Sequence, residues 1–412
     1  MKHMNVLIGQ SGGPTAVINA SLAGVISGSI DAGANRIYGM VHGIQGFLDG
    51  RITDLGAHFK NEQDLELLKR TPSSFLGSCR YSLPSPEKDE GLYEHLFSLL
   101  KRLDITDFFY IGGNDSMDTI FKLNRYGRAL GSPIRFIGVP KTIDNDLAVT
   151  DHCPGYGSAA KFVASTCKEL IRDLLVYERD EVTVLEIMGR DAGWLTAACS
   201  LAKGPDCEGL DLICLPETPF DLDVFTEKVA CLKESKKSVT IAVSEGIRDA
   251  QGKYMSAMDA TVDAFGHQKL RGTAAFLSTH LGSKLGIRSK SIEFSSIQRC
   301  AAHMSSLCDV NEAFLAGATA VEAAEDGKSG MMVSFTRKSD EPYVCVAELI
   351  DVAEVANKVK HFPAEWITED GVGSQFNAYA LPLIQGELPP IMDHGLPRHL
   401  VRSVSEELHL PM

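Results

Sequence analysis

Short apolar and β-branched runs alternate along the chain with longer segments of helical pattern, and this alternation limits the fold more than any other feature. The short runs predict strands at Asn5–Gly9, Arg36–Val41, Asp107–Gly112, Ile134–Val139, Thr183–Met188, Leu210–Leu215, Val239–Ser244 and Ser291–Phe294. The longer segments predict helices at Ala16–Ser29, Gly91–Leu103, Ser116–Leu130, Ser158–Tyr177, Gly193–Lys203 and Phe220–Lys236. Strands that alternate with helices form mostly parallel sheets covered on both faces, so the predicted fold class is α/β.

The length of 412 residues suggests two or three packed lobes rather than one. Open α/β sheets bind ligands beyond the carboxyl ends of their strands. A cluster of glycines or polar residues directly after a strand is therefore the expected place for a functional site. Four of the predicted strand ends carry such a cluster.

Charge and composition exclude several classes of partner. The net charge of -14 argues against binding to nucleic acid or to an anionic membrane, because both need clustered Lys and Arg. No apolar run approaches the roughly 20 residues of a spanning helix, and the run that ends at Gly9 is too short for a signal-peptide core. We therefore expect a cytoplasmic protein. The ten cysteines include no C-x-x-C pair, so neither a zinc site nor a disulfide framework is predicted.

The first cluster is Gly9–Thr15, which joins the first strand to the first helix. Gly12 and Gly13 would let backbone N–H groups approach an anion, and the helix that follows adds a favourable dipole. The segment fits neither the Walker pattern nor G-x-G-x-x-G, so the P-loop and Rossmann dinucleotide interpretations lose support. A tight strand-to-helix turn without a ligand remains the alternative.

The second cluster is Gly112–Thr119, at the end of the third strand. Two glycines, the carboxylate of Asp115 and the hydroxyl of Ser116 could hold Mg²⁺ and phosphate oxygens, because this ion prefers hard oxygen ligands. The alternative is that Asp115 or Ser116 only caps the helix.

The third cluster, Pro140–Asp146, is the most informative. A sugar hydroxyl that attacks phosphorus needs a base to accept its proton, while the transferred group needs cationic neighbours. Asp144 can be that base, Asp146 can orient it or assist a metal, and Lys141 can neutralise phosphate. The alternative is an Asx-rich turn with solvated acids.

The remaining clusters gain weight only as members of the set. Glu186–Trp194 closes a strand and carries Arg190, whose rigid fork suits a phosphate or a carboxylate. Glu245 ends another strand, and Arg299 follows the strand that ends at Phe294. A single Arg or Glu is more often part of a surface ion pair than a ligand contact.

Seven motifs together resemble those of the phosphofructokinase family, in the family's order and approximate spacing. They are GQSGGPTAVIN, FLGSCR, GGNDS, PKTIDND, MGRDAGW, SEG and IQR, and the resemblance runs from Met4 to about residue 350.

The resemblance implies two Rossmann-like lobes with the active site in the cleft between them. The donor lobe would comprise residues 1–152 and about 300–365, the sugar lobe 153–299, and residues 366–412 would be a C-terminal extension that packs on the lobes. The resemblance also implies that this chain forms a homodimer or homotetramer.

The resemblance also implies roles for individual residues. Asp144 would be the base for the sugar 1-hydroxyl, with Thr142 and Asp146 beside it. The expected contacts with fructose 6-phosphate are Met188, Gly189, Arg190, Glu245 and Arg299, and those with the donor are Gly12, Gly13 and Arg80.

Two positions indicate the phosphoryl donor. Members that use ATP carry glycines where this chain has Asp115 and Lys141, whereas members that use pyrophosphate carry Asp and Lys. Both side chains would enter the space of the nucleotide's α-phosphate, and Asp115 would also repel it. The expected reaction is reversible transfer of a phosphoryl group from pyrophosphate to fructose 6-phosphate, with Mg²⁺ as cofactor.

Several positions depart from the family pattern. Asn114 stands where a magnesium-associated Asp is usual, so its amide oxygen or Asp115 must serve the metal. Glu181 replaces an Arg that usually reaches a sugar phosphate across a subunit interface, and Ser296 replaces a His or Tyr. Lys290 or Arg288 would then supply the missing positive charge. Weaker binding of the sugar 6-phosphate could also allow sedoheptulose 7-phosphate to bind as a substrate.

Three other functions stay open at this point. An ATP-dependent phosphofructokinase differs only in donor. A non-catalytic regulatory subunit would share the fold, although the intact Asp144 and Asp146 count against it. A nicotinamide-dependent dehydrogenase would lack its expected glycine fingerprint.

Overall fold

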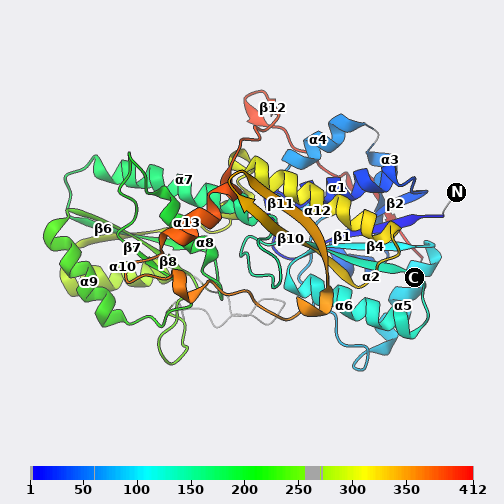
Figure 1. Cartoon of the computed structure of the whole chain (residues 1–412), viewed down its shortest axis with the longest axis horizontal. Helices are drawn as coiled ribbons and strands as arrows, with labels where there is room; N and C mark the ends of the chain where they lie inside the picture. The colour runs from blue at the N-terminus through cyan, green and yellow to red at the C-terminus, as the bar shows by residue number, and fades with distance from the viewer. Residues whose placement is uncertain (1–2, 60, 256–269, 271, 412) are drawn as a thin grey trace.

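The computed structural model describes residues 3–59, 61–255, 270 and 272–411. In this part of the chain two sheets of unequal size are flanked by helices, as Figure 1 shows. The predicted α/β class is confirmed. Every described helix is too short or too polar to cross a bilayer.

The larger sheet has eight strands in the order β11-β10-β5-β4-β1-β2-β3-β14. Their bounds are β1 (Asn5–Gln10), β2 (Arg36–Met40), β3 (Arg51–Asp54), β4 (Asp107–Gly112), β5 (Arg135–Pro140), β10 (Met331–Asp340), β11 (Tyr343–Asp351) and β14 (Glu407–His409). Strands β2, β1, β4, β5 and β10 run parallel, and the three outer pairings are antiparallel. The parallel centre brings the ends of β1, β4 and β5 to one edge.

Successive residues of a strand in this sheet point to opposite faces and pack into two different hydrophobic cores. Val6 and Ile8 pack into the core that contains residues of α1 and α12, whereas Leu7 packs into the core of α5 and α6. The helices are α1 (Ile18–Asp31), α2 (Gly43–Leu48), α3 (Leu55–His58), α4 (Glu62–Arg70), α5 (Glu90–Arg102), α6 (Asn114–Ala129) and α12 (Leu307–Glu325). Burial on both faces explains why the central strands read as continuous apolar runs.

The smaller sheet has four parallel strands in the order β7-β8-β6-β9. They are β6 (Glu181–Ile187), β7 (Leu212–Cys214), β8 (Ser238–Ser244) and β9 (Arg288–Glu293). The helices around them are α7 (Tyr156–Leu175), α8 (Trp194–Ala197), α9 (Leu222–Ser235), α10 (Thr273–Leu285), α11 (Ile297–Cys300) and α13 (Ser374–Ala380).

All eight predicted strands and all six predicted helices are present, but three assignments need correction. The helix predicted at Gly193–Lys203 is a single α-helical turn, α8, followed by a 3₁₀ segment at Ala198–Ala202. The antiparallel hairpin β10-β11 and the short strand β3 were not predicted. Strand β3 has only four residues, and no residue of β11 is fully buried, so neither has the buried apolar run typical of a central strand.

The segment after residue 365 is more structured than its irregular sequence suggests. Within the Pro-rich segment Leu381–Pro397, β12 (Met392–Asp393) and β13 (Leu396–Pro397) form a short hairpin. The chain then returns to the larger sheet, where β14 pairs antiparallel with β3. The C-terminal extension predicted for residues 366–412 therefore supplies an edge strand and also helix α13.

Candidate active site

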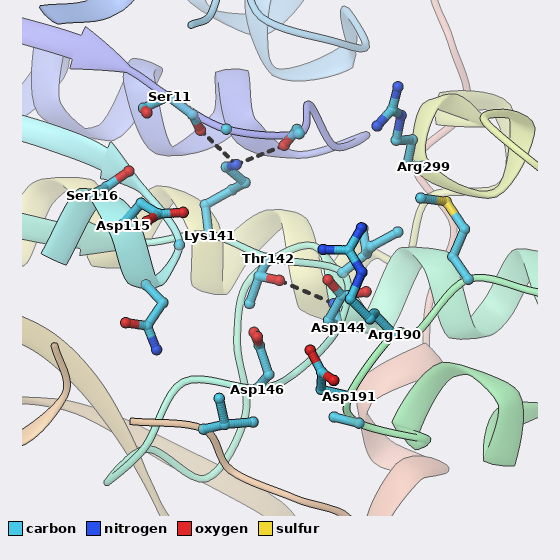
Figure 2. A pocket seen from close by; sticks show the side chains of 18 of the residues that line it. Ser11, Asp115, Ser116, Lys141, Thr142, Asp144, Asp146, Arg190, Asp191 and Arg299 are labelled. Atoms are coloured by element: carbon cyan, nitrogen blue, oxygen red, sulfur yellow. Dashed lines mark hydrogen bonds between the residues drawn. The ribbon is translucent and has the colours of Figure 1, made fainter. Parts of the chain in front are cut away.

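A cavity of about 420 Å³ lies where strands of the two sheets end, a volume in the range of small-molecule sites. Loops after β1, β4 and β5 line it from the larger sheet, and loops after β6 and β8 line it from the smaller one. Figure 2 shows many of the side chains that converge on it. The predicted residues that line it are Gly12, Gly13, Arg80, Asn114, Asp115, Lys141, Thr142, Asp144, Asp146, Met188, Arg190, Glu245 and Arg299.

The loop after β1 is held open around a buried ammonium group. Gly12 has a φ of 77°, a conformation that favours glycine. Lys141 donates hydrogen bonds to the carbonyl oxygens of Ser11 at 2.8 Å and Gly13 at 2.6 Å, as Figure 2 shows. The side chain is buried, and burial lowers the pKa of Lys141 to about 7, although Asp144 opposes the shift. One cation thus joins two of the predicted motifs.

The loop after β4 presents the start of α6 to the cavity. Asp115 and Ser116 line the wall there, and the Ser82 hydroxyl lies 3.4 Å from an Asp115 carboxylate oxygen. Asn114 is held differently. Its amide oxygen accepts the Asn357 backbone N–H at 2.6 Å, and its amide nitrogen donates to the Lys358 carbonyl. Both ends of the Asn114 amide are therefore bonded to one backbone segment.

The loop after β5 turns sharply and places two carboxyl groups at the cavity. Asn145, with a φ of 54°, separates Asp144 from Asp146, and the Asp144 N–H donates to the Thr142 hydroxyl at 3.1 Å. Burial raises the pKa of Asp144 to about 7, and the charges of Asp146 and Glu245 add to the rise. Burial also raises the pKa of Asp146. A carboxyl group that titrates near neutral pH suits a general base.

The opposite wall comes from the smaller sheet. Gly189 adopts a φ of 135°, and its N–H lies 3.4 Å from a carboxylate oxygen of Glu245. Burial raises the pKa of Glu245 to about 7. The backbone segments after β6 and β8 pack closely here, since a Cβ on Gly246 would lie 1.9 Å from the Arg190 carbonyl oxygen. Met188, Arg190 and Glu245 line the cavity, whereas Gly189 supports the turn between the first two.

Arg299, in α11 after β9 of the smaller sheet, approaches the loop after β1. A Cβ on Gly13 would lie 3.4 Å from an Arg299 guanidinium nitrogen. Lys290, which the sequence assigned to the same sugar phosphate, does not line the cavity of this chain. Its ammonium lies 2.7 Å from Glu181 near the amino ends of β6 and β9, away from the strand ends that form the site. The role of Lys290 at the substrate phosphate therefore stays a prediction.

Several contributors come from a region in which no motif was identified. Asn357 and Val359 line the cavity, and Lys360 and Tyr379 hold the turn after β5 from behind. Asp191, which sits inside the MGRDAGW motif but was given no role, also lines the wall. No local pattern marks Lys360 or Tyr379, because both act on a turn more than 200 positions earlier in the chain.

The cavity offers the oxygen ligands that a hard divalent cation prefers. Asp115, Asp144 and Asp146 converge on it. Among the described residues, however, the one cluster of three close metal-binding side chains is His152, Glu312 and Cys345, which does not line this cavity. The donor set thus fits an ion such as Mg²⁺, which binds through one or two carboxylates and completes its shell with water and substrate phosphate.

Comparison with known proteins gives consistent results. Residues 5–324 match the sequence model of the family described as phosphofructokinase. The chain is 40% identical to the pyrophosphate–fructose 6-phosphate 1-phosphotransferase of Xanthomonas campestris, over 100% of this chain and 99% of that protein. It is 39% identical to the protein of the same name from Halomonas elongata, over 97% and 96%. The solved pyrophosphate-dependent phosphofructokinase of Nitrosospira multiformis superposes with a TM-score of 0.87 at 36% identity, over 99% and 98% of the two chains.

Proposed function

The chain belongs to the phosphofructokinase family, and from this premise we propose that it transfers a phosphoryl group from pyrophosphate to the 1-hydroxyl of fructose 6-phosphate. The products are fructose 1,6-bisphosphate and phosphate, and the reaction is reversible. The family resemblance seen in the sequence is confirmed. Relatives that align over the full chain carry the name of this activity.

The observation that carries the choice of donor is the position of Lys141. Its ammonium is fixed by two carbonyl oxygens of the loop after β1, and Asp115 lines the same side of the cavity. A bound diphosphate would bring negative charge to this ammonium and favour its protonated form. A longer donor would have to displace both side chains, and Asp115 would repel its additional phosphate.

Asp144 is the proposed general base. Its pKa near 7 lets it accept a proton at neutral pH while remaining partly ionised beforehand. Asp146 and Thr142 lie beside it in the same turn. When the sugar hydroxyl attacks the terminal phosphorus, its proton passes to Asp144, the bond to the bridging oxygen breaks, and phosphate leaves. Lys141 would neutralise charge on the donor during this step.

The sugar phosphate is proposed to bind at the opposite wall. Glu245 would accept a hydrogen bond from a sugar hydroxyl, and Arg190 and Arg299 would bind the 6-phosphate. Met188 and Gly189 shape this side. Gly12, Gly13 and Arg80 are the proposed donor contacts on the facing loops.

Mg²⁺ is the proposed metal, since this class of reaction needs a divalent cation to neutralise charge on the transferring group. Asp115 is the residue proposed to hold it, with Asp146 in support. Asn114 was the other sequence candidate, but its amide is already bonded to the backbone of residues 357–358. We therefore favour Asp115 as the ligand.

The test is turnover by the purified chain with fructose 6-phosphate, Mg²⁺ and either pyrophosphate or ATP. We expect turnover with pyrophosphate and little with ATP. Preference for ATP would support the alternative ATP-dependent phosphofructokinase, and binding of sugar phosphate without turnover would support a regulatory subunit. Comparing kcat/KM for fructose 6-phosphate and sedoheptulose 7-phosphate would show how tightly the sugar is selected.

Two further proposals concern the cellular compartment and the oligomeric state of the enzyme. All ten cysteines are free thiols, which fits a reducing compartment and supports the cytoplasm. We propose a homodimer or homotetramer, as the family resemblance implies. Light scattering on the purified chain would test this assembly.

A further inference from the structure

One side chain from outside the family-matched region holds the turn that carries Asp144 and Asp146, two of the acidic residues that line the cavity. Lys360 lies beyond residue 324, where the match to the family ends. Its ammonium nitrogen lies 2.8 Å from the Asp151 carbonyl oxygen, 3.2 Å from the Thr150 carbonyl oxygen and 3.4 Å from Oδ1 of Asn145. All three partners are acceptors, so they take the three hydrogens of a protonated ammonium group.

The backbone of Lys360 adds two bonds that fix its position. Its N–H donates to the Asp146 carbonyl oxygen at 2.8 Å. Its carbonyl oxygen accepts from the Trp194 indole N–H at 3.0 Å, and its ammonium lies 4.9 Å from the Trp194 ring centre. The residue is therefore held on the side of the turn that faces away from the substrates, and it does not itself line the cavity.

Asn145 is the part of the turn that Lys360 grips. It is fully buried and adopts left-handed backbone geometry between Asp144 and Asp146. Its amide oxygen accepts the Cys153 N–H at 2.9 Å in addition to Lys360, and its amide nitrogen donates to the Tyr379 hydroxyl at 2.8 Å. The Tyr379 hydroxyl in turn donates to the Asp151 carbonyl oxygen at 2.8 Å. Two of the three partners of the Asn145 side chain, Lys360 and Tyr379, thus come from the C-terminal part of the chain.

We propose that Lys360 is a positioning residue for the reaction: it fixes the Asp144–Asn145–Asp146 turn and supplies a half-buried positive charge behind the two carboxyl groups. The inference rests on the proposed function of Asp144 as the base. A displacement of the base by about 1 Å can cost about 100-fold in rate, so the grip on Asn145 should affect kcat more than substrate binding.

A split between kcat and KM gives a readout that a purely structural role would not give. Lys360 does not line the cavity, so its removal should leave the substrate contacts in place and displace the turn that carries Asp144. The loss should therefore fall on kcat, with little change in KM for fructose 6-phosphate.

The experiment compares Lys360→Met with Lys358→Met in the full chain. Lys358 is the matched control, because it is the same residue type two positions earlier with an exposed side chain. For Lys360→Met we expect kcat to fall about 10- to 100-fold, with KM for fructose 6-phosphate within about twofold of the parent. Lys360→Arg should restore part of the kcat, because it keeps the charge. Lys358→Met should match the parent.

Three outcomes would overturn the proposal: a parent-like kcat for Lys360→Met, a rise in KM for fructose 6-phosphate as large as the fall in kcat, or an equal effect of Lys358→Met. If Lys360→Met does not fold, Tyr379→Phe provides the test, since it removes only the hydroxyl that binds Asn145. A parent-like kcat for Tyr379→Phe would then refute the role of the grip. Absence of turnover by the parent enzyme with either donor would instead refute the proposed function, so the two failures are distinguishable.

Discussion

The ammonium nitrogen of Lys141 lies 2.6 Å from the carbonyl oxygen of Gly13, a residue 128 positions earlier in the sequence. The same nitrogen binds the Ser11 carbonyl oxygen. Lys141 therefore both shapes the loop after β1 and brings positive charge to the proposed donor site. These two roles make its removal more costly than the loss of one exposed charge.

We expect Lys141→Met to lower kcat/KM for pyrophosphate by at least about 100-fold, since hydrogen bonds that involve a charged group contribute about 1.5–3 kcal/mol each. Steady-state kinetics with varied pyrophosphate would measure the loss. Lys101→Met, at an exposed position of α5, is the control. A parent-like kcat/KM would contradict the assignment of Lys141 to the donor site.

Replacement of the proposed base should abolish most turnover without unfolding the protein. Asp144→Asn keeps the size of the side chain but cannot accept the proton, so kcat should fall about 10²- to 10⁴-fold. Asp173→Asn makes the same change at an exposed position of α7 and should leave kcat unchanged. If Asp144→Asn turned over at the parent rate, another group would have to be the base.

The stability of the substrate-free enzyme should fall as the pH rises from about 4 toward 7. Burial raises the pKa of Asp144 from 3.8 and that of Glu245 from 4.5, each to about 7. Between these values the folded protein binds more protons than the unfolded chain, so the contribution to stability is full below pH 4 and lost through pH 7. Urea unfolding of the parent and of the Asp144→Asn, Glu245→Gln double variant at pH 5 and 7.5 would measure this. The double variant should have the smaller pH dependence.

A buried ion network that joins the segment after β5 to α12 should make stability depend on His152. Its ring nitrogens lie 2.8 Å from Asp151 and 2.7 Å from Glu312. These carboxylates raise the pKa of His152 from 6.5 to about 9, against the effect of burial. The stabilisation is therefore fully present below pH 6.5 and is lost as the pH rises through about 9.

His152→Gln should lower the free energy of unfolding by about 3–5 kcal/mol at pH 6, the usual result of removing one partner from a buried ion pair. The difference from the parent should shrink by pH 9.5. His394→Gln is the control, because the His394 side chain is 98% exposed. An equal effect of the two substitutions in urea unfolding would contradict the role of the network.

A substitution at Asn114 tests whether this residue binds the metal or only holds the backbone of residues 357–358 by hydrogen bonds. Asn114→Asp keeps an acceptor for the Asn357 N–H but loses the donor to the Lys358 carbonyl oxygen. If Asn114 only holds the backbone, the change should lower the free energy of unfolding by about 1 kcal/mol and leave the apparent affinity for Mg²⁺ unchanged. Tighter apparent Mg²⁺ affinity with unchanged stability would show instead that position 114 ligates the metal.

The sequence alone determined the features that depend on neighbours along the chain. Buried strands followed by glycine turns and helices predicted the α/β class, and the residues after β1, β4 and β5 were recognised because a turn and its chemistry share one short segment. The same local logic located Asp115, Lys141 and Asp144, all of which line the cavity. The short strands β3 and β14, at one side of the larger sheet, escaped prediction, because strands of three or four residues contain no long apolar run.

Only the tertiary structure decided which distant segments meet. It paired Lys290 with Glu181 near the amino ends of β6 and β9, and it brought Lys360 and Tyr379 to Asn145 across more than 200 positions of sequence. Contacts of this kind depend on how two packed layers are oriented, because a side chain's partners are set by the surface it faces. The local sequence determines the backbone conformation of a residue. The packing of the two sheets and their helices then determines which groups its side chain contacts.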